Sequence, residues 1–177
     1  YFKEAIAKCA DAAKRYGYDS LKFERGDIAE YDANAPADMV VTLHACDTAT
    51  DYALHNAICR GARMILSVPC CQHELNGQIA TDRLKLITRY GIIKERFAAL
   101  MTDAIRANLL ESRGYKTQVL EFVDLSHTPK NLLIRAIKKR PALDNAGRIA
   151  LDEAKALMEE FSLEPTLYSL LYPHSAD

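Results

Sequence analysis

At 177 residues the chain is long enough for one compact domain with its own hydrophobic core. Apolar residues make up 49% and charged residues 27%, the balance of an ordinary globular protein. The net charge of −1 argues against a strongly basic nucleic-acid-binding surface, and no apolar run approaches the roughly 20 residues that span a bilayer. The five cysteines include the adjacent pair Cys70 and Cys71, which suits a disulfide framework poorly and predicts a reducing compartment, by default the cytoplasm.

The N-terminal residues predict an amphipathic helix that is already under way where the sequence starts. Apolar residues follow helical spacing up to Ala13, and Gly17 can end the helix. Neither an initiator Met nor an N-cap residue precedes it, so we interpret the sequence as a fragment that lacks an upstream portion. Residues 21–26 are then expected to form a short strand.

Two short apolar runs predict buried strands at residues 39–43 and 64–68. The helix expected between them can be capped by Thr48 or Thr50 and ends at Gly61. Both runs are continuously apolar instead of alternating, which is typical of strands covered on both faces of a sheet. Sequential strands joined by a helix are usually parallel neighbours, so we expect these two strands to lie side by side.

The second half of the chain is expected to contain two helices, then two strands, then one more helix. These elements are predicted at residues 81–90, 93–112, 116–123, 131–138 and 149–161. The close succession of the two strands predicts an antiparallel pair at one edge of the sheet. The fold class is therefore α/β, a doubly wound, mostly parallel sheet with an antiparallel last strand and an incomplete N-terminus. We assign residues 1–140 to this domain and residues 141–177 to a helical extension packed on it.

Polar and reactive side chains follow both strands of the predicted parallel pair. His44, Cys46 and Asp47 come directly after the first strand, and residues 70–74 follow the second. In an open α/β sheet, the carboxyl ends of adjacent parallel strands form the crevice in which ligands bind. Two such ends, both containing cysteine, histidine and acidic residues, predict an active site.

Three strings resemble a family of class I S-adenosylmethionine-dependent methyltransferases. They are His-x-Cys-x-x-Ala-Thr-Asp at residues 44–51, Pro-Cys-Cys-x-His at 69–73 and His-Thr-Pro-Lys-Asn at 127–131. The first two are also similar to segments of the tRNA acceptor-stem 2′-O-methyltransferases. The resemblance covers most of the chain, and it implies a Rossmann-like methyltransferase fold, S-adenosylmethionine as the cofactor, and an enzyme that acts in RNA modification.

The resemblance also implies roles for individual residues. The catalytic residues would be His44, Cys46, Asp47, Cys70, Cys71 and His73. The cofactor-binding residues would be Asp27, placed near the adenine ring, and His44. The substrate-binding residues would be Asp51, Gln72, Glu74, His127, Lys130 and Asn131. Within this set, His44 and Asp47 are the candidates that accept or steer a proton, and residues 70–74 would line the acceptor pocket.

One departure from the family limits what this chain can do alone. The family's glycine-rich loop after its first strand and the acidic residue that ends its second are both absent from the sequence. The cofactor site is therefore expected to be incomplete, and the fragment alone inactive. Residues 21–26 would also lack a neighbouring strand, which predicts either a homodimer contact through residues 1–30 or a displaced N-terminal segment.

Each candidate residue also has a structural interpretation. His44 and Cys46 could pack at a strand end, Asp47 could cap the following helix, and Asp51 could interact with the helix dipole. A zinc site is disfavoured because adjacent cysteines on a strand point to opposite faces, so we expect no metal. Cysteines after both strands also match the nucleophile positions of the cytosine C5 RNA methyltransferases, which keeps that chemistry open.

The acceptor is less well defined than the fold. RNA is favoured by the resemblance, although a near-neutral charge weakens this expectation, and a protein or small-molecule acceptor stays open. No membrane partner is expected. The alternatives from other classes are a non-catalytic binding or assembly module that retains the fold, for which the absent glycine-rich loop would argue, and a zinc-stabilised interaction domain.

Overall fold

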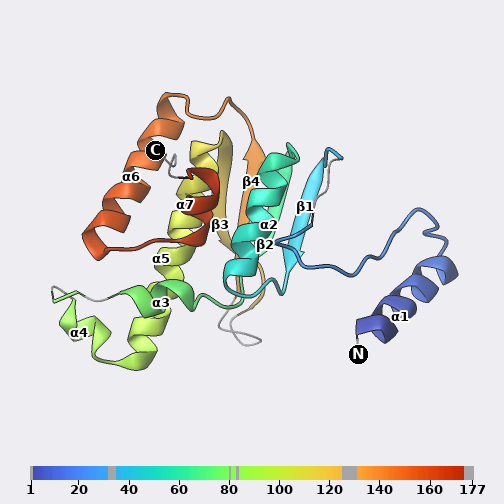
Figure 1. Cartoon of the computed structure of the whole chain (residues 1–177), viewed down its shortest axis with the longest axis horizontal. Helices are drawn as coiled ribbons and strands as arrows, with labels where there is room; N and C mark the ends of the chain where they lie inside the picture. Colours follow the sequence, from blue (N-terminus) through green and yellow to red (C-terminus); the bar gives the residue numbers. More distant parts are fainter. Residues whose placement is uncertain (1, 32–34, 80, 83, 125–130, 174–177) are drawn as a thin grey trace. The chain divides into compact units, whose positions relative to one another are not determined.

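The structure is a computed structural model that describes residues 2–31, 35–79, 81–82, 84–124 and 131–173 (Figure 1). The chain forms two compact units, Tyr1–Asp32 and Ala33–Asp177. The described residues contain no helix that is long and apolar enough to cross a membrane.

The first unit contains one helix, α1 (Phe2–Arg15), as the apolar spacing predicts. Gly17 follows it with a φ of 76°, a left-handed conformation that glycine adopts without strain. The strand predicted at residues 21–26 is wrong, because this segment forms no strand. A single strand is stable only when it is hydrogen-bonded to a neighbour, and the described residues of the first unit offer none.

The second unit is built on a four-stranded sheet of order β1-β2-β4-β3 (Figure 1). Its strands are β1 (Met39–Leu43), β2 (Met64–Val68), β3 (Tyr115–Glu121) and β4 (Leu132–Lys138). β1 and β2 pair in parallel, with Met39 opposite Met64 and Leu43 opposite Val68, which confirms the predicted parallel pair. β4 lies between β2 and β3 and is antiparallel to both. The predicted mixture of parallel strands and one antiparallel strand is therefore confirmed.

Helices connect and follow the strands of the second unit. They are α2 (Thr48–Cys59), α3 (Glu74–Gln78), α4 (Lys85–Thr88), α5 (Gly91–Ser112), α6 (Asn145–Phe161) and α7 (Thr166–Leu171). α2, α5 and α6 match predicted helices. The helix predicted over residues 81–90 is wrong in length, because only the short helix α4 lies within that range, and the other short helix, α3, precedes it. Neither short helix runs long enough for the apolar spacing of a full helix to develop.

One face of the sheet packs against helices and forms the core. Leu54 of α2, Leu109 of α5, Ile65 of β2 and Ile134 of β4 are all fully buried in one cluster, and Leu167 of α7 belongs to the same cluster. α6 packs on α5, and α7 packs on α2. The two C-terminal helices therefore share the core of the second unit.

The opposite face of the sheet is apolar but exposed at β1. Met39, Val41 and Leu43 are 52%, 55% and 60% exposed, while Val40 packs against the core and Thr42 is buried. We expected both faces of the sheet to be covered, but the described residues of the second unit leave one face of β1 uncovered. The continuous apolar runs correctly predict two apolar faces, but composition cannot show which elements cover them.

Candidate functional site

The loops after β1 and β2 lie at the same edge of the sheet, as predicted from the parallel pairing. Asp47 joins them, since its Oδ1 accepts hydrogen bonds from the backbone N–H groups of His73 (2.8 Å) and Glu74 (3.0 Å). The backbone N–H of Asp47 donates to the carbonyl oxygen of Cys71 at 3.1 Å. Three hydrogen bonds from one residue therefore fix the two loops against each other.

The backbone around Cys46 is strained. His44 has a φ of 59° and Asp47 has a φ of 53°, although neither is glycine. Such conformations cost about 1 kcal/mol or more each, and they concentrate at functional sites. The two strained residues turn the chain sharply between the end of β1 and the start of α2. Cys46 lies inside this turn and is exposed.

Three cysteines of these loops, Cys46, Cys70 and Cys71, form what we term the thiol cluster. Their three Sγ atoms lie within 4.8 Å of one another, and those of Cys46 and Cys70 are 3.2 Å apart. Burial, together with hydrogen bonds from Cys46 and Cys71, raises the pKa of the Cys70 thiol to about 12. A free Cys70 is therefore protonated near neutral pH, which weighs against its predicted role as a nucleophile.

His44 and His73 contribute exposed side chains on the two loops, one from each strand end. His44 follows β1 directly, and His73 immediately precedes α3. Because the loops are joined through Asp47, one molecule bound at this edge can reach residues of both. Imidazole is the side chain best suited to accept a proton near neutral pH.

A buried ionic network lies beneath the loops. The Arg106 guanidinium of α5 donates to both carboxylate oxygens of Asp51, at 2.9 and 2.6 Å, and to the carbonyl oxygen of Asp47 at 2.9 Å. It also contacts Asp103 at 3.2 Å, and the Gln72 side-chain amide donates to the other oxygen of Asp103 at 2.9 Å. The side chains of Arg106, Asp51 and Asp103 are each no more than 3% exposed, so solvent does not screen these contacts. The network ties both strand-end loops to α2 and α5.

Arg106 stabilises the two buried carboxylates of the network unequally. Burial raises the pKa of Asp103 to about 6, because its single contact with Arg106 offsets the loss of solvent only in part. Burial alone would lower the pKa of Arg106, but the carboxylate of Asp51, followed by that of Asp103, outweighs burial and raises it. Asp51, with two short hydrogen bonds, is the principal partner of the guanidinium.

Several predicted substrate-binding residues already have partners within the protein. Asp51 and Gln72 belong to the buried network, and Glu74 accepts hydrogen bonds from the backbone and side chain of Thr166 at the start of α7. Asn131 is 3% exposed and donates to the carbonyl oxygen of Val123 at 3.0 Å. These contacts give the four residues structural roles, and their predicted substrate contacts stay predictions. The predicted residues His127 and Lys130 lie outside the described residues.

The residues expected to hold S-adenosylmethionine fit it only in part. Asp27 belongs to the first unit, where its Oδ1 accepts a hydrogen bond from the backbone N–H of Ala29 at 2.9 Å. His44 stands at the end of β1. None of the four described strands runs into a glycine-rich turn that would let backbone N–H groups approach the cofactor's amino-acid end. The described residues therefore lack the glycine-rich turn that the family's cofactor site would need.

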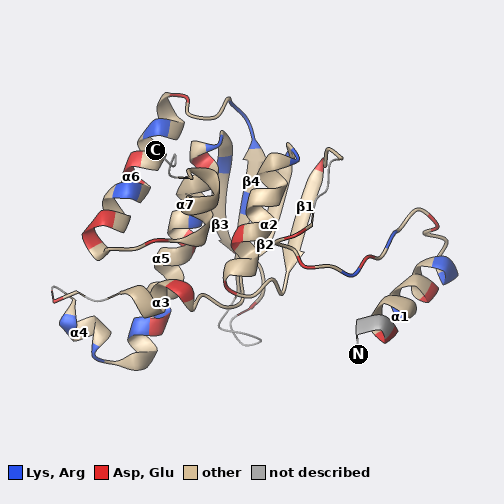
Figure 2. Cartoon of the chain, viewed as in Figure 1, with Lys and Arg blue, Asp and Glu red and all other residues tan. Residues whose placement is uncertain are grey.

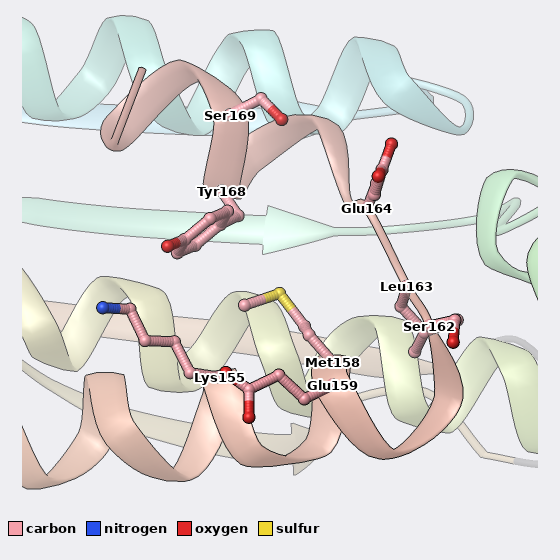
Figure 3. Close-up of a pocket in the computed structure, with 8 residues that line it drawn as sticks. All are labelled: Lys155, Met158, Glu159, Ser162, Leu163, Glu164, Tyr168 and Ser169. Carbon is pink, nitrogen blue, oxygen red and sulfur yellow. The ribbon is translucent and has the colours of Figure 1, made fainter. Parts of the chain in front are cut away.

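A separate surface pocket of about 720 Å³ lies between α6 and α7 (Figure 3). Its lining includes Lys155 and Glu159 of α6 and Tyr168 of α7. None of the predicted site residues lines it. The pocket is therefore distinct from the edge where the strand-end loops meet.

Sequence reasoning missed the two α5 members of the buried network, Asp103 and Arg106. Their spacing of three residues on the buried face of a helix was a usable signal, because charges on a buried helix face are rare unless they are paired. The sequence pattern did not identify Asp51 and Gln72 as their partners, which lie 55 and 31 residues away.

A family model described as a methyltransferase domain matches residues 2–78 of the chain. The match supports the interpretation of the chain as part of a methyltransferase. The matched segment includes β1, α2, β2 and both strand-end loops, so it contains the thiol cluster and Asp47. No curated protein sequence and no solved structure matches the chain.

Proposed function

We propose that this chain carries the acceptor side of an S-adenosylmethionine-dependent methyltransferase, with RNA as the favoured acceptor. The observation that carries the proposal is the joining of two reactive loops by Asp47 at the carboxyl edge of a parallel strand pair. Ligands of open α/β sheets bind at this edge. The methyltransferase family match over the same loops supports the assignment.

The sheet topology supports the Rossmann-like methyltransferase variant of the fold. In the dinucleotide-binding variant the sheet is all parallel, whereas β4 here inserts antiparallel between β2 and β3. We therefore propose the methyltransferase variant for the second unit, and the family match over residues 2–78 supports this proposal.

In the proposed mechanism the protein acts mainly by positioning. The bound cofactor supplies an electrophilic methyl group. His44 and His73 lie exposed on the joined loops and would accept the proton that the attacking acceptor atom gives up. Asp47 is a positioning residue, because its Oδ1 is engaged by two backbone N–H groups. The buried Arg106 network keeps both loops in register, which matters since small displacements cost much of the rate in such reactions.

The proposed RNA acceptor rests on the motif resemblance and not on charge. Lys and Arg residues of α6 alternate with Asp and Glu instead of forming a basic face (Figure 2). With a net charge of −1, binding would depend on local contacts at the loops more than on a broad electrostatic surface.

Transfer of a labelled methyl group tests the proposal. The 177-residue chain, and any longer form of the protein that its coding sequence encodes, are incubated with methyl-labelled S-adenosylmethionine and either total RNA or total protein. We expect label in RNA that is removed by ribonuclease. Label in protein would overturn the RNA assignment, and no label with any form would favour the non-catalytic binding module.

A further inference from the structure

We propose that the thiol cluster binds one Zn²⁺ ion through the sulfurs of Cys46, Cys70 and Cys71, leaving a fourth coordination position open to solvent. The proposal goes beyond methyl transfer and does not depend on it. Thiolates are soft ligands that select ions such as Zn²⁺, and three of them from two loops form a compact donor set.

The spacing of the sulfurs fits a zinc ion. Zinc–sulfur bonds of about 2.3 Å in tetrahedral geometry place the sulfurs about 3.8 Å apart. The three Sγ atoms lie within 4.8 Å of one another, and those of Cys46 and Cys70 are 3.2 Å apart. The required spacing falls between these values, so changes of up to about 1 Å in the sulfur–sulfur separations would complete the site. Rotation of the exposed Cys46 side chain can supply such a movement.

Cys70 and Cys71 lie outside β2, so the opposite orientation of adjacent strand residues, which disfavoured a metal, does not hold for them. Adjacent cysteines point to opposite faces within a strand, but β2 ends at Val68, and Cys70 and Cys71 lie in the loop beyond it. There the alternation of a strand no longer separates their sulfurs. Both can therefore serve one ion.

The loops are organised before any ion binds. The hydrogen bond from the Asp47 backbone to Cys71 and the two that its Oδ1 accepts fix one loop to the other. The left-handed residues His44 and Asp47 flank Cys46 and set its position. A site that is already ordered loses little entropy on binding, and backbone strain of this kind concentrates where ligands bind.

The exposure of the cluster indicates an open site and not a closed structural one. Cys46 is exposed, and Cys70 and Cys71 are half-buried. Structural zinc sites use four protein ligands, whereas sites with three protein ligands leave the fourth position to water or substrate. We therefore infer that an exogenous ligand can reach the ion.

Titration of the reduced, metal-free full chain with Co²⁺, followed by displacement with Zn²⁺, tests the site. We expect one equivalent of Co²⁺ to give the thiolate charge-transfer and visible bands of a tetrahedral site, and one equivalent of Zn²⁺ to abolish them. Loss of a single outer hydrogen-bond partner costs about 10- to 100-fold in metal affinity, so loss of a thiolate in Cys46→Ser, Cys70→Ser or Cys71→Ser should weaken binding at least about 100-fold. Cys9→Ser and Cys59→Ser are the matched controls and should bind as the wild type does.

Circular dichroism of each variant separates lost binding from lost folding, and Cys46→Ser is the most secure variant because that side chain is exposed. Failure of the folded wild type to bind one equivalent of Zn²⁺ would overturn the proposal. Unchanged affinity in a folded Cys46→Ser variant would do the same. The readout uses no methyl donor, so its outcome is independent of the methyl-transfer assay.

Discussion

Replacing Arg106 by Met should destabilise the protein severely. The Met side chain fills similar space but removes the hydrogen bonds to both oxygens of Asp51, to Asp103 and to the Asp47 carbonyl. Two carboxylates that are no more than 3% exposed would then lose their cation. Breaking a buried ion pair from one side costs about 3–5 kcal/mol, a large part of the roughly 5–15 kcal/mol that a typical domain has.

The pH dependence of the loss tests its electrostatic origin. Without the guanidinium, the folded-state pKa of Asp103, which burial already raises, would lie further above that of the unfolded chain. An acid with a raised pKa penalises the folded state at pH values above that pKa, and the penalty is relieved as the pH falls below it. The cost of Arg106→Met should therefore be larger at about pH 8 than at about pH 5.

Urea unfolding at both pH values measures these free energies. Arg96→Met, an exposed residue on the same helix, is the control and should change the free energy of unfolding by no more than about 0.5 kcal/mol. A cost for Arg106→Met below about 1 kcal/mol that is equal at the two pH values would refute the reasoning.

Two further outcomes are expected from the structure and one from the sequence. Gly114→Ala should lower the free energy of unfolding by well over about 1 kcal/mol, because its φ is 88° and a Cβ there would lie 2.2 Å from the Arg140 carbonyl oxygen. Gly77→Ala is the control and should be tolerated, because open space surrounds that position. The raised pKa of Asp103, about 6, predicts that the free energy of unfolding of the wild type falls as the pH rises from about 4 to about 6. The fall should exceed that of Asp103→Asn by roughly 1–3 kcal/mol, which urea unfolding across this pH range measures. The sequence predicts either a homodimer contact through residues 1–30 or a displaced N-terminal segment. A sedimentation coefficient that rises with concentration, and no longer does so after truncation of these residues, would indicate the homodimer; a monomer at all concentrations would contradict it.

The sequence predicts the positions of strands correctly where short apolar runs are bounded by polar residues. The strands at Met39–Leu43 and Met64–Val68 have the predicted bounds, and their parallel pairing follows from the helix between them. The shared edge of the Cys46 and Cys70 loops follows from the same pairing. Local pattern and chain topology are sufficient for these features.

Other features depend on contacts that no local pattern encodes. The strand expected at residues 21–26 has the right composition but no neighbour to pair with in its unit. Asp51 has the sequence position of a helix-dipole residue, yet its partner is Arg106, 55 residues later. The close approach of Cys71 to Cys46 depends on the path of the loop after Val68, which the apolar pattern of the strand does not determine.

The central claim, that the acceptor reacts at the joined loops, is tested most directly by the rate of methyl transfer in histidine variants, made in the form of the protein that transfers the labelled methyl group. His44→Ala and His73→Ala are compared with His55→Ala, which removes a partly buried histidine of α2 that lies beside Cys59. Loss of a general base lowers the rate of the chemical step by about 10²- to 10⁴-fold. We expect a loss of this size in at least one of the two loop variants, and near wild-type rates for His55→Ala. Wild-type rates in both loop variants would contradict the account.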